Sequence, residues 1–319
     1  MTWLILTLSC IILYGITDIL LKKSLNYSDP LSQYKTFVWI GLLSALLSVI
    51  TAACSDTLPE SILILARNPY IIPINIFYVV AMFFGLLGAK HLDASVVSPL
   101  ENIDGAISAI ILYLFFFLTG RSHVTDSIGI VDIIGTGAIT VGVILLGIQE
   151  QKLSKQEAKL DEDKKKHRLG ALALLFPIVY NLADALSMVA TGIMVSGETE
   201  FSIPDIDYIF FESLAFSAFA LFVWLYMLIT KKYVYNPFKK TEIYCFGAAT
   251  CETLGTTAFT FAVAISPILT APITSSYCLV TIILARILLK ERLTKKQYLS
   301  LAFLVAGIAI LGISEILSA

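Results

Sequence analysis

The sequence predicts an all-α membrane protein in which ten transmembrane helices form a 5+5 inverted-topology repeat around a central cavity. Three observations lead to this fold class: an apolar composition, apolar segments of helical length, and short sequences that recur between the two halves. Of the 319 residues, 57% are hydrophobic and only 14% are charged, whereas a soluble protein carries about 25% charged residues. Such a composition cannot cover a water-facing surface, so lipid must surround much of the chain. The net charge of −2 gives no indication of nucleic-acid binding.

Ten apolar segments are long enough to cross a membrane, since a helix needs about 20 residues to span a hydrocarbon core of about 30 Å. The predicted spans are 3–21, 36–54, 71–89, 94–118, 128–148, 169–195, 207–230, 243–265, 268–289 and 297–316. The first segment has neither a basic start nor a small-residue cleavage site, so we expect a membrane helix rather than a removed signal peptide. We therefore expect a first five-helix repeat over 1–149, a charged linker over 150–168 and a second five-helix repeat over 169–319.

Lysine and arginine predict which connections face the cytoplasm, because these residues are enriched on that side of a membrane. Of the 22 basic residues, all except Arg67 and Arg121 lie in or beside the connections that follow the odd-numbered spans. The connection "SGETEFSIPDID" at 196–207 carries four acids and no base. We therefore expect a multi-pass protein of the cell membrane, with both termini outside and the linker 150–168 in the cytoplasm.

The two halves of the chain share short sequences in the same order. "LYGITD" at 13–18 resembles "VYNLAD" at 179–184, 166 positions later, and Pro99 corresponds to Pro272 at an offset of 173. Because five is an odd number of spans, the second copy must cross the membrane in the opposite direction. Inverted repeats of this kind are common in secondary transporters, where two like halves open a central site to either side in turn. The alternative is a chance similarity between apolar helices, but the shared order and the 5+5 count favour the repeat.

The last part of the sequence carries a more specific pattern. "LLKERLTKKQYLSLAFLVAGIAILGI" at 288–313 is similar to the end of proteins of the EamA type, in the drug/metabolite transporter superfamily. In that family a Glu-Arg-Leu-Thr-like turn joins the last two spans and precedes a glycine-bearing helix. Glu291–Thr294 match this turn, whereas the first-half counterpart keeps only Arg121. The resemblance covers essentially the whole chain and implies the ten-helix fold and membrane transport, often export, of a solute that it does not identify.

Charged residues inside the spans are candidates for function, because burying a charge in a bilayer costs about 2.5–3.5 kcal/mol on insertion scales. The charged residues of the spans are Asp18, Glu101, Asp104, Asp132, Asp184, Glu212, Glu252 and Arg286. Asp132 and Glu212 lie close to the outer ends of their spans, so we expect solvated acids at the membrane interface. Arg286 lies near a cytoplasmic end, where its long side chain can reach the headgroups.

Three acids lie deeper. With a helical rise of about 1.5 Å per residue, Glu101, Asp104 and Glu252 enter their spans by roughly 10–16 Å. Glu101 and Asp104 are three residues apart and share a helix face. Two carboxylates at that spacing in a low dielectric cannot both stay ionised unless a proton, a cation or polar partners stabilise them. A structural cluster satisfied by Asn102 is the alternative, but acids at this depth favour a pathway, so we expect proton coupling through Glu101, Asp104 and Glu252.

The two Tyr-x-x-x-Asp sequences predict matching walls of the cavity. Tyr14 lies one helical turn before Asp18, and Tyr180 lies one turn before Asp184, so each tyrosine shares a face with its aspartate. A phenol at that position can donate to the carboxylate or present its ring to a cation. For Asp18 an ion pair with Lys22, four residues later, is an equally good interpretation, and ordinary aromatic packing explains each tyrosine alone. Asn181 lies in the second of these sequences and completes the predicted solute-binding residues.

Other patterns are not found. The five cysteines are scattered without metal-ligand spacing, which predicts neither a disulfide framework nor a zinc site. No phosphate-binding loop and no hydrolase motif occurs, so we expect neither an enzyme nor a cofactor. Glu252 stands in "CETLGTT", whose small and hydroxyl residues can form a polar cavity wall.

Together these features predict a secondary transporter, working by alternating access, for a small cationic or zwitterionic metabolite or drug. Its expected partners are the solute, protons and the lipid bilayer, with no nucleic acid, and the protein is expected to be a monomer or a homodimer. One alternative is a facilitator or exchanger of a neutral or anionic metabolite. Another is a membrane scaffold without transport activity, which the many deep acids disfavour.

Overall fold

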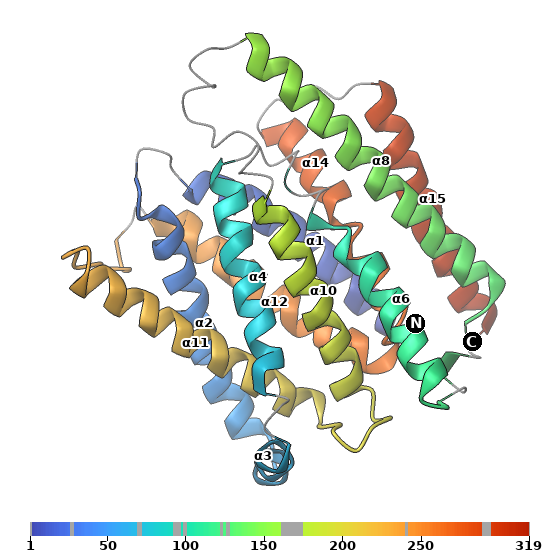
Figure 1. Cartoon of the computed structure of the whole chain (residues 1–319), viewed down its shortest axis with the longest axis horizontal. Coiled ribbons are helices and arrows are strands. Elements are labelled where there is room, and N and C mark those ends of the chain that lie inside the picture. Colours follow the sequence, from blue (N-terminus) through green and yellow to red (C-terminus); the bar gives the residue numbers. More distant parts are fainter. Residues whose placement is uncertain are drawn as a thin grey trace.

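The computed structural model describes residues 2–25, 29–68, 72–91, 97, 101–121, 124–125, 128–160, 175–239, 242–288 and 295–318. Within these residues the chain is built from helices that run roughly alongside one another (Figure 1). The helices are α1 (Thr2–Ser24), α2 (Ser32–Cys54), α3 (Leu58–Arg67), α4 (Ile72–His91), α6 (Asp104–Leu118), α8 (Ile130–Leu160), α10 (Leu175–Val195), α11 (Asp205–Ile229), α12 (Ile243–Ile265), α13 (Thr270–Thr274), α14 (Tyr277–Leu288) and α15 (Lys295–Ser318).

The helices have the composition and the surface of a membrane protein. Six of those described are long and apolar enough to cross a membrane: α1, α2, α10, α11, α12 and the interrupted pair α13–α14. Shorter apolar helices lie in α4, α6, α8 and α15. Large apolar side chains cover the outside, where Val49, Leu118 and Phe222 are 67%, 77% and 63% exposed. The expectation of an α-helical protein embedded in a membrane is therefore confirmed.

The helices are arranged around α1 and α10. α2 packs along α11 at one edge of the bundle, and α8 packs along α15 at the other (Figure 1). Between these edges α1 packs against α12 and α14, while α10 packs against α4 and α6. α8 and α15 approach closely, since a Cβ added to Gly135 would lie 2.6 Å from a side-chain carbon of Leu311 and 3.2 Å from the carbonyl oxygen of Gly307.

Two elements differ from the predicted spans. The short helix α3 was not predicted, because it has only ten residues and combines buried Ser61 and Leu65 with exposed Ile62 and Leu63. Figure 1 shows it end-on at one end of the bundle. The helix α8 continues to Leu160, so the first part of the predicted linker is helical, and the rest of the linker lies outside the described residues.

Two predicted spans are interrupted. Span 268–289 divides into α13 and α14 at a turn over Ser275 and Ser276. Pro272 lacks the N–H that a continuous helix needs, and the Ser275 and Ser276 hydroxyls donate to backbone carbonyl oxygens at 3.1 and 2.5 Å, which competes with regular helix bonding. In span 94–118, α6 begins only at Asp104, after a turn at Asn102 and Ile103. Pro99, the predicted counterpart of Pro272, lies outside the described residues.

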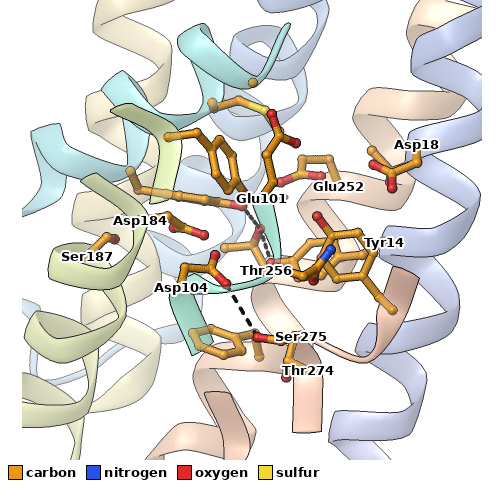
Figure 2. Close-up of a pocket in the computed structure, with 18 of the residues that line it drawn as sticks. Tyr14, Asp18, Glu101, Asp104, Asp184, Ser187, Glu252, Thr256, Thr274 and Ser275 are labelled. Carbon is orange, nitrogen blue, oxygen red and sulfur yellow. Dashed lines mark hydrogen bonds between the residues drawn. The ribbon is translucent and has the colours of Figure 1, made fainter. Parts of the chain in front are cut away.

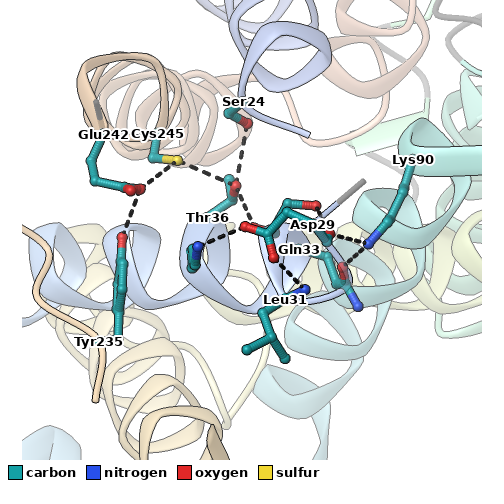
Figure 3. Close-up of polar contacts among 11 residues, drawn as sticks. Ser24, Asp29, Leu31, Gln33, Thr36, Lys90, Tyr235, Glu242 and Cys245 are labelled. Atoms are coloured by element: carbon teal, nitrogen blue, oxygen red, sulfur yellow. Dashed lines mark hydrogen bonds and ion pairs between the residues drawn. The ribbon is translucent and has the colours of Figure 1, made fainter. Parts of the chain in front are cut away.

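Polar contacts join the helix ends on one side of the bundle (Figure 3). Lys90 at the end of α4 donates to the carbonyl oxygen of Asp29 at 2.9 Å and to Gln33 Oε1 at 2.6 Å. Lys35 on α2 forms an ion pair with Asp29 at 2.6 Å. A separate chain of contacts links Ser24 to α12: the hydrogen bonds are Ser24–Thr36, Thr36–Cys245, Cys245–Glu242 and Tyr235–Glu242. These contacts fix the ends of α1, α2, α4 and α12 relative to one another.

A second polar cluster lies at the opposite end of α2. Asp207 in the first turn of α11 is completely buried. Its carboxylate accepts hydrogen bonds from Ser55, from Thr57 at 2.7 Å and from Ser61 at 2.6 Å. Because Ser55 follows α2 and Ser61 belongs to α3, this single carboxylate holds three helices together at this end.

Candidate solute site

A cavity of about 60 Å³ lies between α1, α4, α6, α10, α11, α12 and the break between α13 and α14. A buried water needs roughly 10–15 Å³, so this volume holds a few water molecules, and a larger solute requires the helices to separate. Six carboxyl side chains line the cavity: Asp18, Glu101, Asp104, Asp184, Glu212 and Glu252. They come from α1, α6 and its preceding turn, α10, α11 and α12. Figure 2 shows Asp18, Glu101, Asp104, Asp184 and Glu252.

The cavity brings together most of the predicted solute-binding residues. Tyr14, Asp18, Glu101, Asn102, Asp104, Tyr180, Asp184 and Glu252 all line it. Asn181 is not among the lining residues, and its amide nitrogen instead donates to the carbonyl oxygen of Pro177 at 2.8 Å. Asn181 follows Tyr180 by one position, which turns it about 100° around the helix from the cavity-facing tyrosine.

One lining acid contradicts its prediction. Glu212 was expected to be solvated at the membrane interface, but it is only 6% exposed and faces the cavity. Its distance from the end of α11 is short, yet α2, α4, α10 and α12 all pack against α11 and cover it. Asp132 is buried as well, but away from the cavity, at the start of α8, where it accepts a hydrogen bond from the N–H of Gly129 at 2.8 Å. Arg286 is exposed as predicted and lies over the ring of Tyr298.

On one side of the cavity, hydroxyl groups form a continuous chain. Tyr14 of α1 lies against Gly255 of α12, where an added Cβ would be 2.8 Å from its ring. The Tyr14 and Tyr78 hydroxyls lie 3.1 and 3.2 Å from Thr256 Oγ1. Tyr78 in turn donates to Glu252 Oε1 at 2.5 Å. We call Tyr14, Tyr78, Glu252 and Thr256 the hydroxyl wall; only one of its four members is an acid.

On the other side, acids lie close together. Tyr180 of α10 lies against Gly85 of α4, where an added Cβ would be 2.9 Å from its ring. Asp104 and Asp184 both line this side of the cavity, and both are buried. Glu101 is 6% exposed, and its Oε1 has no hydrogen-bond partner among the described residues. We call Glu101, Asp104, Tyr180 and Asp184 the carboxyl wall; three of its four members are acids.

The break between α13 and α14 meets the carboxyl wall. Asp104 Oδ1 accepts hydrogen bonds from the N–H of Gly105 at 2.6 Å and from Ser275 Oγ at 3.4 Å (Figure 2). A Cβ on Gly105 would lie 2.6 Å from the carbonyl oxygen of Ala271, so only glycine allows the first turn of α6 to approach the break this closely. The two interrupted helices thus touch at the cavity.

Asp18 and Lys22 also line the cavity, at the α1 side. The Thr281 hydroxyl donates to Asp18 Oδ2 at 2.7 Å, and Lys22 donates to the carbonyl oxygen of Ala89 at 3.3 Å. Each side chain therefore has a contact outside the predicted i,i+4 pair. Lys22 is the one base among the described lining residues, against six acids. In a low dielectric such a set cannot be fully ionised without added positive charge, so protons or a cationic solute must balance it.

Comparison with known proteins supports the fold and leaves the function open. No protein-family model matches the sequence, and no curated protein matches it. Among solved structures, 23 chains match. One of these, described as "Crystal structure of protein", superposes with a TM-score of 0.59 over 99% of both chains at 13% sequence identity. At this identity the similarity concerns the fold alone, and it extends along the whole chain.

Proposed function

We propose that this protein is a secondary transporter of the EamA type that moves a small cationic or zwitterionic solute by alternating access. The observation that carries the proposal is the convergence of six carboxyl side chains and, among the described lining residues, one base on a single cavity within a membrane-embedded bundle. Buried acids at a membrane's midplane mark solute and proton pathways. Export is the expected direction.

The 5+5 inverted repeat is part of this proposal, and the helix packing supports it. In the proposed repeat each principal helix of the first half has an equivalent in the second: α1 and α10, α2 and α11, α4 and α12, α6 and α14, α8 and α15. When each helix is replaced by its equivalent, every principal helix–helix contact becomes a contact that the structure also contains. The contact of α1 with α12 becomes that of α10 with α4, and the contact of α1 with α14 becomes that of α10 with α6. The same exchange relates the Tyr14–Gly255 contact to the Tyr180–Gly85 contact. The six long and four shorter apolar helices would supply the ten spans.

The proposed orientation has both termini outside and the linker in the cytoplasm. The start of α1 and the end of α15 lie at the same end of the bundle, as an even number of spans requires (Figure 1). Trp3 and Leu311 belong to one apolar cluster, which agrees with this arrangement. The basic connections at the other end would then face the cytoplasm.

Coupling to protons would use Glu101, Asp104 and Glu252. A cationic solute that enters the cavity adds positive charge beside these acids, which favours release of their protons, and protonation from the other side favours release of the solute. The polar contacts at the two ends, around Asp29 and Asp207, would act as gates that separate in turn. This is an exchange of protons for solute between two halves of like structure.

A second candidate is a facilitator or exchanger of a neutral or anionic metabolite. Lys22 favours it, because this base lines the cavity and could pair with an anionic group. The hydroxyl wall would supply further donors. In this case the acids would remain protonated structural groups.

The test has two stages. Thermal-shift measurements on the purified protein against amines, amino acids and organic anions would identify the solute class. Uptake into proteoliposomes with an imposed pH gradient would then be compared for the wild type and for Glu101→Gln, Asp104→Asn and Glu252→Gln. We expect the gradient to drive flux in the wild type and not in these variants, with Asp132→Asn as a control because it is a buried acid outside the cavity. Cation flux that ignores the gradient and is unchanged in the three variants would contradict the coupling.

A further inference from the structure

A second, smaller cavity adjoins the central one. It has a volume of about 20 Å³ and lies between α2, α11 and α12. Tyr78, Glu212, Glu252 and Thr256 line both cavities. The two spaces therefore adjoin at these four residues, two of which are the acids Glu212 and Glu252.

Polar groups without partners surround this smaller cavity. Glu212 is 6% exposed, and among the described residues its carboxyl group accepts no hydrogen bond and forms no ion pair. The hydroxyls of Ser44 and Ser213 likewise have no hydrogen-bond partner in the described part of the chain, although both residues are only 5% exposed. Thr253 Oγ1 is buried without a partner as well. Glu212, Ser44 and Ser213 thus line one space in the interior of the protein from two helices, α2 and α11, whereas Thr253 Oγ1 has almost no surface open to that space.

Such groups need a ligand, because lipid and apolar side chains offer them no hydrogen bonds. A water molecule requires roughly 10–15 Å³ and two to four polar partners, and the cavity of about 20 Å³, lined by Ser44, Glu212 and Ser213, meets both conditions. Glu252 Oε1 already accepts a hydrogen bond from Tyr78, which leaves Oε2 as the atom able to exchange a proton with such a water.

We propose that Glu212 is a further proton-carrying residue, which exchanges a proton with Glu252 through one water molecule in this second cavity. The inference rests on the proposed transport function and adds a residue and a route to it. The protonated Glu212 carboxyl gives its proton to the water, and the water gives one of its own protons to Glu252 Oε2. The products are a Glu212 carboxylate, a Glu252 carboxylic acid and an unchanged water molecule.

The neighbours of Glu212 fit this role. Glu252 faces it from α12, Asp184 acts on it from α10, Tyr78 faces it from α4, and Tyr208 lies one turn earlier on α11. From α2 the described lining residues of the small cavity are Ile40, Ser44 and Leu47, none of them titratable. Glu212 thus lies between two acids, Glu252 and Asp184, with an uncharged helix on the third side. Of these two acids only Glu252 shares the small cavity with it, so a water held there connects Glu212 to Glu252.

Infrared difference spectroscopy of the purified protein in lipid, recorded as the pH is varied, tests the inference without any solute. We expect Glu212→Gln to remove one titrating carboxyl band and to shift the pH at which the Glu252 band titrates. Glu252→Gln should shift the Glu212 band in return. Asp132→Asn is the control and should leave both bands unchanged.

Removing the water site gives a second, milder measurement. Ser44→Ala combined with Ser213→Ala should weaken the shift between the two bands, while Ser48→Ala, one turn further along α2 and outside the cavity lining, should not. A Glu252 band that titrates identically in the wild type and in Glu212→Gln overturns the inference. That result would leave the transport proposal standing, because flux driven by a pH gradient through Glu101, Asp104 and Glu252 is measured separately.

Discussion

The two walls of the cavity share a tyrosine–glycine contact between helices and differ in the polar side chains around that contact. In both, a tyrosine of one helix lies against a glycine of another: Tyr14 of α1 lies on Gly255 of α12, and Tyr180 of α10 lies on Gly85 of α4. Around Tyr14 the polar partners are hydroxyl groups that end in one carboxyl, whereas around Tyr180 they are three carboxyls. The comparison teaches that the tyrosine–glycine contact sets the position of a wall, while neighbouring side chains decide its charge.

This difference predicts separate roles for the two walls. The hydroxyl wall is held by three consecutive hydrogen bonds between side chains, so it fixes geometry. The carboxyl wall contains three buried acids, and among the described residues Glu101 Oε1 has no hydrogen-bond partner. The negative charge of these acids must be balanced by a cation or by protons. Substitutions in the carboxyl wall should therefore change binding, and those in the hydroxyl wall should change stability.

The largest effect is expected when the two aspartates of the Tyr-x-x-x-Asp sequences are compared. Asp184→Asn removes a charge from the carboxyl wall, and a hydrogen bond to a charged group is worth about 1.5–3 kcal/mol. This corresponds to a loss of roughly 10–100-fold in affinity for a cationic solute. Asp18→Asn should cost less, because its amide oxygen can still accept the hydrogen bond from Thr281. Titration calorimetry with the amine that gives the largest thermal shift measures both.

This experiment can also break the comparison. Equal losses in Asp184→Asn and Asp18→Asn would mean that an acid of the carboxyl wall contributes no more to binding than an acid outside both walls. Ser187→Ala is a useful control, because Ser187 lines the cavity on α10 without carrying a charge.

The second-largest effect tests the tyrosine–glycine contact that both walls share. A methyl group on Gly255 would lie 2.8 Å from the ring of Tyr14, and one on Gly85 would lie 2.9 Å from the ring of Tyr180. Overpacking of this kind costs about 1–3 kcal/mol, so Gly255→Ala and Gly85→Ala should each lower the melting temperature in detergent. Gly137→Ala is the matched control, since no atom lies within 4 Å of its added methyl group, and alanine favours helices over glycine by about 1 kcal/mol. If all three variants melt alike, the tyrosine–glycine contact does not position the walls.

The third effect separates the two tyrosines of the hydroxyl wall. Tyr78→Phe leaves the Glu252 carboxyl without its donor, whereas Tyr14→Phe removes only a contact with Thr256. A typical hydrogen bond contributes about 0.5–1.5 kcal/mol, with bonds to charged groups above that range, so Tyr78→Phe should lower the free energy of unfolding more. Denaturant unfolding in detergent measures the difference. A larger loss of unfolding free energy in Tyr14→Phe would contradict this order and would mean that Tyr14 of α1 stabilises the hydroxyl wall more than Tyr78 does.

The sequence predicted the apolar helices better than their interruptions. The predicted span 243–265 coincides with α12, because a Ser-Pro pair follows its last residue and ends the apolar segment. The break at Ser275 and Ser276 was not predicted, since the surrounding apolar composition continues through it. Local hydrogen bonds of hydroxyl groups to carbonyl oxygens produce this break, and hydropathy does not measure them.

The site was predicted where charge and helical spacing mark it, and missed where burial depends on neighbouring helices. Asp184 and Glu252 could be found because acids in apolar segments are rare and expensive. Glu212 was placed at the interface because its depth was measured along its own helix, while its burial comes from the helices packed around α11. Tyr78 and Thr256 carry no charge and meet across 178 positions, so no pattern in the sequence connects them.

The smallest effect concerns Asp29, which forms a polar contact outside both walls. Its substitution should change stability slightly without changing solute binding. Partial burial would raise the pKa of Asp29, but hydrogen bonds from Lys35 and the N–H of Leu31, with the positive charges of Lys35 and Lys90, lower it below its usual value of about 3.9. A lowered pKa in the folded state stabilises the protein above the unfolded pKa, and this stabilisation disappears as the pH falls through the folded value.

Because Asp29 is 33% exposed, Asp29→Asn should cost less than about 1 kcal/mol at neutral pH. Melting curves of the wild type and the variant should converge as the pH falls below about 4, and affinity for the solute should not change. A constant difference in melting temperature across the whole pH range would mean that Asp29 acts through its shape rather than its charge.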